Sequence, residues 1–362
     1  MYYEPQVERV RRSPRSIEEA VAVAEEWSSN NIDYVEQNTE DLEVGIERGT
    51  LALRPRHYQG AGYPLTKRAM VTLLKRMHLP TSLAAIFDPP KSSSYLAEHE
   101  VKVEYGLDFI NGLLRDLKVP VVLRSRHDYI RAVLSPAEFI LDYGDMMKHL
   151  ANALRQIQSK VPLNTFFREF QPSDESLPVA VTVAKAPVKQ DRLSQGFKVI
   201  FSENGETRND VYSYVWRKVC ANGLIAPVET AAWRLGIRQL KQNPARAIFS
   251  AVRSALTNAN HLANASVELS KYALPDFKGE QRLEAINTVI DRLSGTIGLP
   301  RSLKSTVAAV WSAQPDLSLY GLQNAMTNLA RQENNERRAN LERAAGRLVF
   351  LPTNRLKTAV KV

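Results

Sequence analysis

The clearest hydrophobic pattern lies in residues 66–78, where apolar side chains recur at the spacing of an α-helix. Thr66 is a typical N-cap residue and Pro80 cannot continue a helix, so the pattern predicts a helix bounded by the two. The basic residues of the segment fall on the opposite face of this helix. The apolar face consists of Met70, Leu73, Leu74 and Met77.

The remaining pattern mixes helical and strand-like segments. Ser16 and Glu19 form a capping box that opens a helix to about Trp27. Further helices are expected at 96–117 and 141–157, and the chain after Ala231 is mostly helical. Strand-like stretches lie at 42–53, 120–126, 128–135 and 179–188, and Asn204-Gly205 marks a turn between two more.

This order predicts an α+β fold with a mixed central sheet-and-helix body and a helical C-terminal region. We expect three parts. They are an acidic helical N-terminal extension (1–50), an α+β core (51–265) and a helical C-terminal region (266–362).

Residues 210–225 admit two interpretations. In the first, Asp210 caps a helix over 211–221 that ends at Asn222 or Gly223, with Cys220 on its buried face. In the second, the alternation of Val211, Ser213 and Val215 indicates a strand. We expect the helix, which places Cys220 on a buried face. A structural role for Cys220 also follows from the histidines, because none lies in a recognisable catalytic motif with it.

Composition excludes several classes of protein. A single cysteine excludes an intrachain disulfide and a multi-cysteine metal site, and it fits a reducing cytoplasm. The first 20 residues lack the apolar region of a signal peptide, and no apolar run approaches the roughly 20 residues of a membrane span. Phosphate-binding, dinucleotide-binding and hydrolase motifs are absent from the sequence. We expect a cytoplasmic protein with no membrane partner and no cofactor.

Charge is unevenly distributed along the chain, whose formal net charge is +9. Residues 1–50 hold 5 basic and 12 acidic side chains, whereas residues 51–80 hold 6 basic and none acidic. Residues 331–362 hold 8 basic and 3 acidic side chains. This distribution permits a polyanionic partner, although a charge run is also typical of a solvated helix face.

Basic and aromatic residues gather in three groups, near positions 54–76, 124–131 and 214–218. Cations neutralise phosphates and aromatic rings stack on bases, so this mixture favours binding to single-stranded nucleic acid. The alternative is that the aromatic residues belong to the core and the cations only solubilise the surface. The candidate nucleic-acid-binding residues are Arg54, Arg56, Tyr58, Tyr63, Lys67, Arg68, Lys75, Arg76, Arg124, Arg126, Trp216, Arg217 and Lys218.

One acidic pair raises the alternative of a metal-dependent nuclease. Asp142 and Asp145 share a helix face at i, i+3, close to Lys148, and such a pair suits a divalent ion. The same spacing is common on solvated helices. We therefore assign no catalytic residue and no metal ligand.

Three stretches carry a resemblance to a family of phage- and plasmid-encoded proteins of unknown function. They are YPLTKRAMVTLLKRMHLP, RSRHDYIRAVLSPAEFILDYGDMM and VWRKVCANGLI. The segment from 320 to 349 shows a weaker similarity to the same family. The chain departs from the family pattern at Pro136-Ala137. The resemblance implies a role with mobile DNA and no known catalytic residues, and its α+β order is similar to that of phage single-strand annealing proteins.

The sequence therefore predicts a single-stranded DNA-binding protein of phage or plasmid replication or recombination, with strand annealing as a candidate activity. Its expected partners are single-stranded DNA and further copies of itself. Two alternatives stay open: a structural or virion-associated oligomeric assembly protein, and a metal-dependent nuclease.

Overall fold

The computed structural model describes most of the 362 residues. The described ranges are 1–4, 14–57, 60–89, 96–138, 141–159, 164–173, 176–184, 193–203, 208–217, 222–225, 232–333 and 335–361. Its elements confirm an α+β fold with a helical C-terminal region. The described helices include none that is long and apolar enough to cross a membrane.

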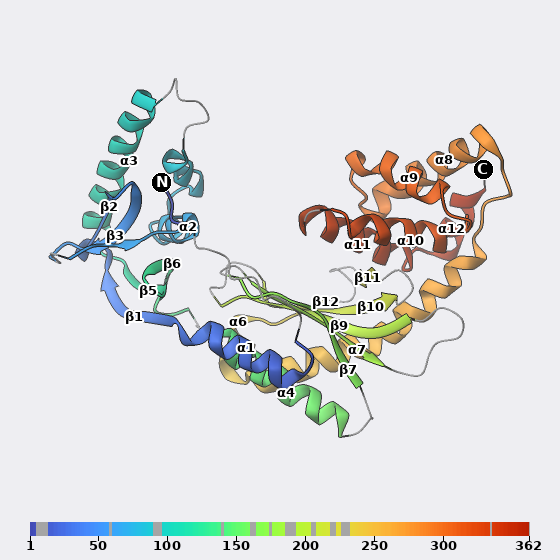
Figure 1. Ribbon diagram of the computed structural model, residues 1–362, viewed down its shortest axis with the longest axis horizontal. Coiled ribbons are helices and arrows are strands. Elements are labelled where there is room, and N and C mark those ends of the chain that lie inside the picture. The colour runs from blue at the N-terminus through green and yellow to red at the C-terminus, as the bar shows by residue number, and fades with distance from the viewer. Residues whose placement is uncertain are drawn as a thin grey trace.

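Three hydrophobic cores follow one another along an elongated molecule, as Figure 1 shows. The N-terminal core combines two three-stranded antiparallel sheets, in the orders β2-β3-β4 and β1-β5-β6, with helices α2 and α3. Its strands are β1 (Asn31–Asn38), β2 (Leu42–Glu47), β3 (Thr50–Pro55), β4 (Tyr63–Pro64), β5 (Pro120–Arg126) and β6 (Tyr129–Leu134). Its helices are α2 (Lys67–Arg76), α3 (Leu96–Leu117) and the 3₁₀ segments η1 (Thr39–Asp41) and η2 (Thr81–Phe87).

The central core lies between an antiparallel sheet and the helices on one of its faces. The sheet has the order β11-β10-β9-β8-β7, and β12 also pairs with β10. Figure 1 shows α1, α4 and α7 below this sheet. The strands are β7 (Asn164–Phe170), β8 (Leu177–Ala184), β9 (Leu193–Phe201), β10 (Asp210–Arg217), β11 (Asn222–Ile225) and β12 (Ala232–Arg234). The helices are α1 (Ile17–Ser29), α4 (Tyr143–Gln158), α6 (Ile237–Gln242) and α7 (Pro244–Glu268).

The C-terminal core is formed mainly by helices, and Val215 of β10 also belongs to it. It begins with the second half of α7, which therefore contributes to two cores. The remaining helices are η4 (Leu269–Lys271), α8 (Gly279–Ile297), η5 (Arg301–Leu303), α9 (Lys304–Ser312), α10 (Leu319–Ala330), α11 (Asn335–Leu348) and α12 (Thr353–Val360). Trp311 is fully buried at the centre of this core.

Local signals for helices are confirmed by the structure. The Ser16 hydroxyl accepts a hydrogen bond from the Glu19 amide, and the Thr66 hydroxyl accepts one from the Ala69 amide, as N-caps of α1 and α2. The predicted apolar face of α2 is buried in the N-terminal core. The two strands expected around His127 form the hairpin β5-β6, with His127 in the left-handed region (φ 51°).

The helix expected over 211–221 is wrong, and the alternative strand is confirmed as β10. Residues 211–215 are all buried, but alternate side chains point to opposite faces, and Val211 and Val215 belong to the central and C-terminal cores. Tyr212 and Tyr214 alternate with them and form a small cluster of their own. The expected helix end at 222–223 lies in β11 instead, paired with 216–217 of β10. Cys220 lies outside the described residues.

A buried ionic network joins the N-terminal core to the central core. Glu203, just after β9, is 1% exposed and receives a charged hydrogen bond from Arg131 of β6. Its carboxylate also accepts from the Tyr143 amide at the start of α4 (2.7 Å), and its carbonyl accepts from Arg124 (3.1 Å). Arg124 also pairs with Asp142. The β5-β6 hairpin and the start of α4, each 60 or more residues away in sequence, are thus held at the single residue Glu203.

A second charged network joins the other face of the sheet to α11. Lys198 of β9 pairs with Glu169 of β7 (2.8 Å), and Arg338 pairs with the buried Glu342 on α11 (3.1 Å). Burial raises the pKa of Glu342 above its usual value, although Lys198 and Arg338 partly offset it. Burial also opposes ionisation of Glu169, but Lys198 and Arg338 outweigh it and lower its pKa.

The first network predicts a large loss of stability on substitution of Arg131. Arg131→Met leaves Glu203 buried without its cation, so the free energy of unfolding falls by about 3–5 kcal/mol. Chemical denaturation at pH 7 measures it. The control is Lys67→Met, because Lys67 forms an exposed pair with Asp88 and its removal costs about 1 kcal/mol or less. Equal effects of the two variants would contradict the structural role of Arg131.

The second network predicts opposite pH dependences for its two carboxylates. Because the pKa of Glu342 is raised in the folded state, its stabilising effect is present at low pH and is lost as pH rises through that pKa. Glu342→Gln therefore gains stability relative to the parent as pH rises. Glu169→Gln should lose stability relative to the parent over the same rise, since the pKa of Glu169 is lowered. Denaturation from pH 4 to 8 tests both, and parallel curves would refute the assignment.

Candidate nucleic-acid interface

Most of the described Lys and Arg residues that the sequence proposed for nucleic-acid binding form ion pairs or hydrogen bonds within the folded chain. Arg54 of β3 pairs with Glu43 (3.2 Å) and Glu47 (3.7 Å). Arg56 donates to the carbonyl of Glu40 (2.8 Å) and thereby fastens the end of β3 to η1. These contacts stabilise the N-terminal core and leave the two guanidinium groups less available to a phosphate.

The Lys and Arg side chains of α2 also interact with other groups of the chain. Lys67 pairs with Asp88 (2.5 Å), and Arg76 pairs with Glu138. Arg68 and Lys75 also interact with neighbouring groups. Tyr63 of β4 packs partly buried against the N-terminal core rather than presenting a free ring.

Arg124 and Arg126, which the sequence proposed as nucleic-acid-binding residues, are both buried, so they do not form such a surface. Arg124 is fully buried in the Glu203 network, and Arg126 is 4% exposed with its guanidinium 3.2 Å from the centre of the Trp27 ring. Both side chains hold the β5 strand against the central core. A buried guanidinium that is already paired cannot reach a nucleic acid without disruption of the fold.

The third proposed group is only partly within the described structure. The backbone of Trp216 and Arg217 lies in β10, but their side chains, like Tyr58 and Lys218, lie outside the described residues. The stacking role proposed for Tyr58 and Trp216 stays a prediction.

The acidic pair considered as a metal site is bound by neighbouring residues. Asp142, the N-cap residue of α4, pairs with Arg124 and accepts a hydrogen bond from the Asn31 side-chain amide (3.0 Å). Asp145 pairs with Lys148 at 3.5 Å. Across the described ranges, no group of three or more His, Cys, Asp or Glu residues could hold a metal ion. The two carboxylates therefore act in ion pairs of the folded chain.

A different basic surface lies along α6 and α7. Residues 230–267 contain five Lys or Arg and no Asp or Glu. The first helical position of α7 is a proline, and the Asn243 side chain caps it by accepting from the Arg246 amide (2.9 Å). The buried face of α7 includes Ile248, Val252, Ala255 and Leu262. Because this face meets two cores, the arginines of α7 lie on the outer side of the helix.

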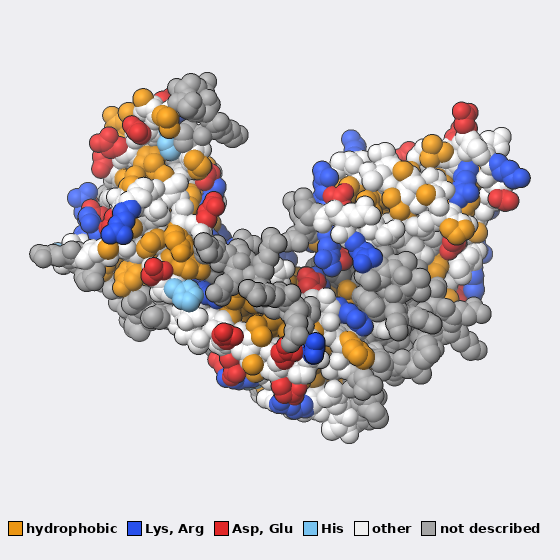
Figure 2. Space-filling model, in the orientation of Figure 1, with side chains coloured by type: hydrophobic (Ala, Val, Ile, Leu, Met, Phe, Trp, Pro, Cys, Tyr) orange, Lys and Arg blue, Asp and Glu red, His pale blue; other side chains and the backbone are white. Residues whose placement is uncertain are grey.

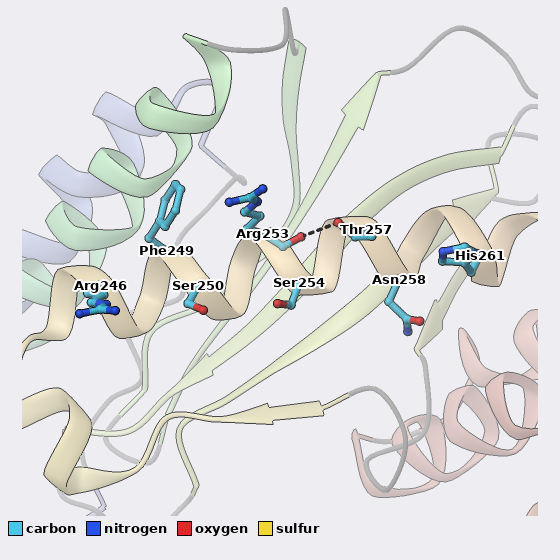
Figure 3. Close-up of a pocket in the computed structure, with 8 residues that line it drawn as sticks. All are labelled: Arg246, Phe249, Ser250, Arg253, Ser254, Thr257, Asn258 and His261. Atoms are coloured by element: carbon cyan, nitrogen blue, oxygen red, sulfur yellow. Dashed lines mark hydrogen bonds between the residues drawn. The ribbon is translucent and has the colours of Figure 1, made fainter.

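The outer side of α7 carries two arginines and a histidine at helical spacing. Arg246, Arg253 and His261 are exposed, and Ser250 and Thr257 lie between them, as Figure 3 shows. With Phe249, Ser254 and Asn258, these residues line a hollow of about 490 Å³. A second hollow of about 410 Å³ adjoins it and shares Arg246 and Ser250. The two hollows form one continuous surface, which we call the α7 surface.

Three arginines line the α7 surface, namely Arg234, Arg246 and Arg253, and a fourth, Arg238 of α6, precedes the lining residue Gln239 in sequence. All four are exposed, and none forms a side-chain hydrogen bond or ion pair with another part of the chain that the structure describes. The N-terminal end of α7, with its partial positive charge, opens onto the second hollow. Guanidinium groups without protein partners are suited to bidentate contacts with phosphate.

Comparisons of the chain with protein-family models, with curated proteins and with solved structures gave no match. The resemblance to phage- and plasmid-encoded proteins therefore stays a prediction.

The signal for the α7 surface is present in the sequence, although it is not a short cluster of arginine and aromatic residues. The arginines of the α7 surface are spread over 20 positions and are connected only by the helix. The absence of acidic residues over 230–267 is the feature that would have identified this surface.

Proposed function

We propose that this protein binds single-stranded nucleic acid, with DNA as the expected form, through the α7 surface. The observation that carries the proposal is the set of four exposed arginines that have no described side-chain partner, in a segment without acidic residues. Such a surface attracts a polyanion, and its contacts with phosphate are independent of base sequence.

The partly buried ring of Phe249 supports a single strand rather than a duplex. It lines the same hollow as Arg253, and Figure 3 shows the two side chains projecting from the same side of α7. An aromatic ring beside a phosphate-binding cation offers an unpaired base a stacking surface. In a duplex the base faces are already stacked, so this contact would be lost.

The resemblance to phage and plasmid proteins supplies the proposed setting, which is recombination or replication of mobile DNA. Strand annealing is the activity expected there. It is to be measured once strand-selective binding has been established.

The first test is fluorescence anisotropy with labelled oligo(dT) and with duplex DNA of equal length, from 50 to 300 mM salt. We expect tighter binding to the single strand and a steep loss of affinity with salt. Absence of binding to either DNA at 50 mM salt would overturn the proposal.

Charge reversal locates the surface. Arg246→Glu with Arg253→Glu should lower the affinity for oligo(dT) at least tenfold and flatten the salt slope by about 1.4, since each phosphate contact on a single strand contributes about 0.7. The matched control is Lys75→Glu with Arg76→Glu on α2, which changes the net charge equally. Loss of binding in the α2 variant alone would move the site back to the cations that the sequence proposed.

A substitution of Phe249 separates stacking from charge. Phe249→Leu keeps an apolar side chain but removes the ring, so the affinity for oligo(dT) should fall several-fold with an unchanged salt slope. Duplex affinity, measured in parallel, should not change. An equal loss for both DNAs would show that Phe249 acts through the fold.

A further inference from the structure

An apolar stripe runs along the outer face of α3. Val101, Tyr105 and Phe109 follow one another at i, i+4 and i+8 and are 51%, 73% and 51% exposed. The opposite face of the helix, with Val103 and Ile110, is buried in the N-terminal core. The exposed stripe is therefore not needed for packing of α3, and large exposed side chains in a row indicate an interaction surface.

The stripe is bordered by acidic residues. α3 holds five Asp or Glu and two Lys or Arg, so its net charge is 2 − 5 = −3. Glu98 pairs with Lys102 (2.5 Å). Glu104 and Asp108 flank the stripe, and neither has a described side-chain partner. Figure 2 shows hydrophobic and acidic side chains mixed in the part of the molecule that contains α3. The surface thus selects a partner that is both apolar and basic.

A surface of that kind lies at the C-terminal end of the same chain. Residues 343–361 contain five Lys or Arg and no Asp or Glu. Phe350, between α11 and α12, is 42% exposed, and Arg355 and Lys357 of α12 are exposed beside it in sequence. The other face of α12 is fixed: Leu356 is buried, and Arg292 of α8 donates to the last carbonyls of the helix.

The two surfaces lie at opposite ends of the molecule. Figure 1, drawn with the longest axis horizontal, shows α3 at one end and α12 with the C-terminus at the other. One chain therefore cannot bring them together. A second copy can, because its basic end meets the acidic α3 of the first. Pairing of α3 with α3 would instead oppose like charges.

We propose that copies of this chain associate head to tail, with the acidic apolar stripe of α3 docking on the basic C-terminal surface around Phe350, Arg355 and Lys357 of the next copy. Such a heterologous contact leaves one surface of each kind unused at every stage, so association continues to a ring or an open chain. A single helix face gives a small interface, so we expect weak association in the micromolar range. The α7 surface takes no part in this contact.

The test uses two charge-reversed variants of the full chain, measured by sedimentation velocity from 1 to 200 μM at 50 mM salt after removal of nucleic acid. One carries Glu104→Lys with Asp108→Lys, and the other carries Arg355→Glu with Lys357→Glu. The parent should associate with rising concentration. Each variant alone should remain monomeric, because its substituted residues then oppose like charges on the contact surface of the next copy. The equimolar mixture should associate again, since both contacts between the two variants are complementary.

Controls distinguish the proposal from its alternatives. Glu26→Lys on α1, away from both ends in Figure 1, should associate like the parent, whereas the single reversal Glu104→Lys should weaken association. A parent that stays monomeric at 200 μM would overturn the proposal. Loss of association in the α3 variant but not in the C-terminal variant would also overturn it, because that result indicates symmetric pairing of α3. Failure of the equimolar mixture to associate would overturn it as well. DNA affinity, measured separately on the α7 surface, does not decide this test.

Discussion

The arrangement of the first two cores depends on one buried carboxylate. Glu203 lies where β6, the end of β9 and the start of α4 meet, and each of these elements supplies part of its environment. A buried charge without its partners costs several kcal/mol, so none of the elements can move away without loss of stability. The hydrophobic cores supply the bulk of the favourable free energy, whereas this network fixes how the β5-β6 hairpin sits on the central sheet.

Helix α7 imposes the corresponding constraint on the other half of the molecule. Its first half packs under the central sheet and its second half enters the C-terminal core, so one face must be apolar over the whole helix. The Ser213 hydroxyl of β10 donates to the Ala255 carbonyl (2.9 Å) and fixes the helix on the sheet. A helix held in this way presents its outer arginines at set intervals. The rigidity of the proposed binding surface therefore follows from the packing of two cores.

The sequence predicted what depends on local signals and missed what depends on distant partners. The caps at Ser16 and Thr66 act within one turn, and the helices that they open were placed correctly. In β10, apolar side chains satisfy a period of two and a helical period alike, and the neighbouring strand β9 decides between them. The burial of Arg124 could not be foreseen, because its acceptor Glu203 lies 79 residues away and arginine is mostly an exposed residue.

The distribution of charged residues along the chain is more informative about binding partners than the net charge of the chain. Net charge of +9 would suggest a uniformly basic protein, yet α3 is acidic while α7 and the C-terminal end are basic and nearly free of acidic residues. Among the described cations, those of the N-terminal core are largely neutralised by neighbouring carboxylates, and their contribution at long range is small. The field outside the molecule therefore comes mainly from the unpaired groups. The proposed polyanion site on α7 and the proposed contact surfaces on α3 and at the C-terminal end therefore lie on separate, differently charged parts of the molecule.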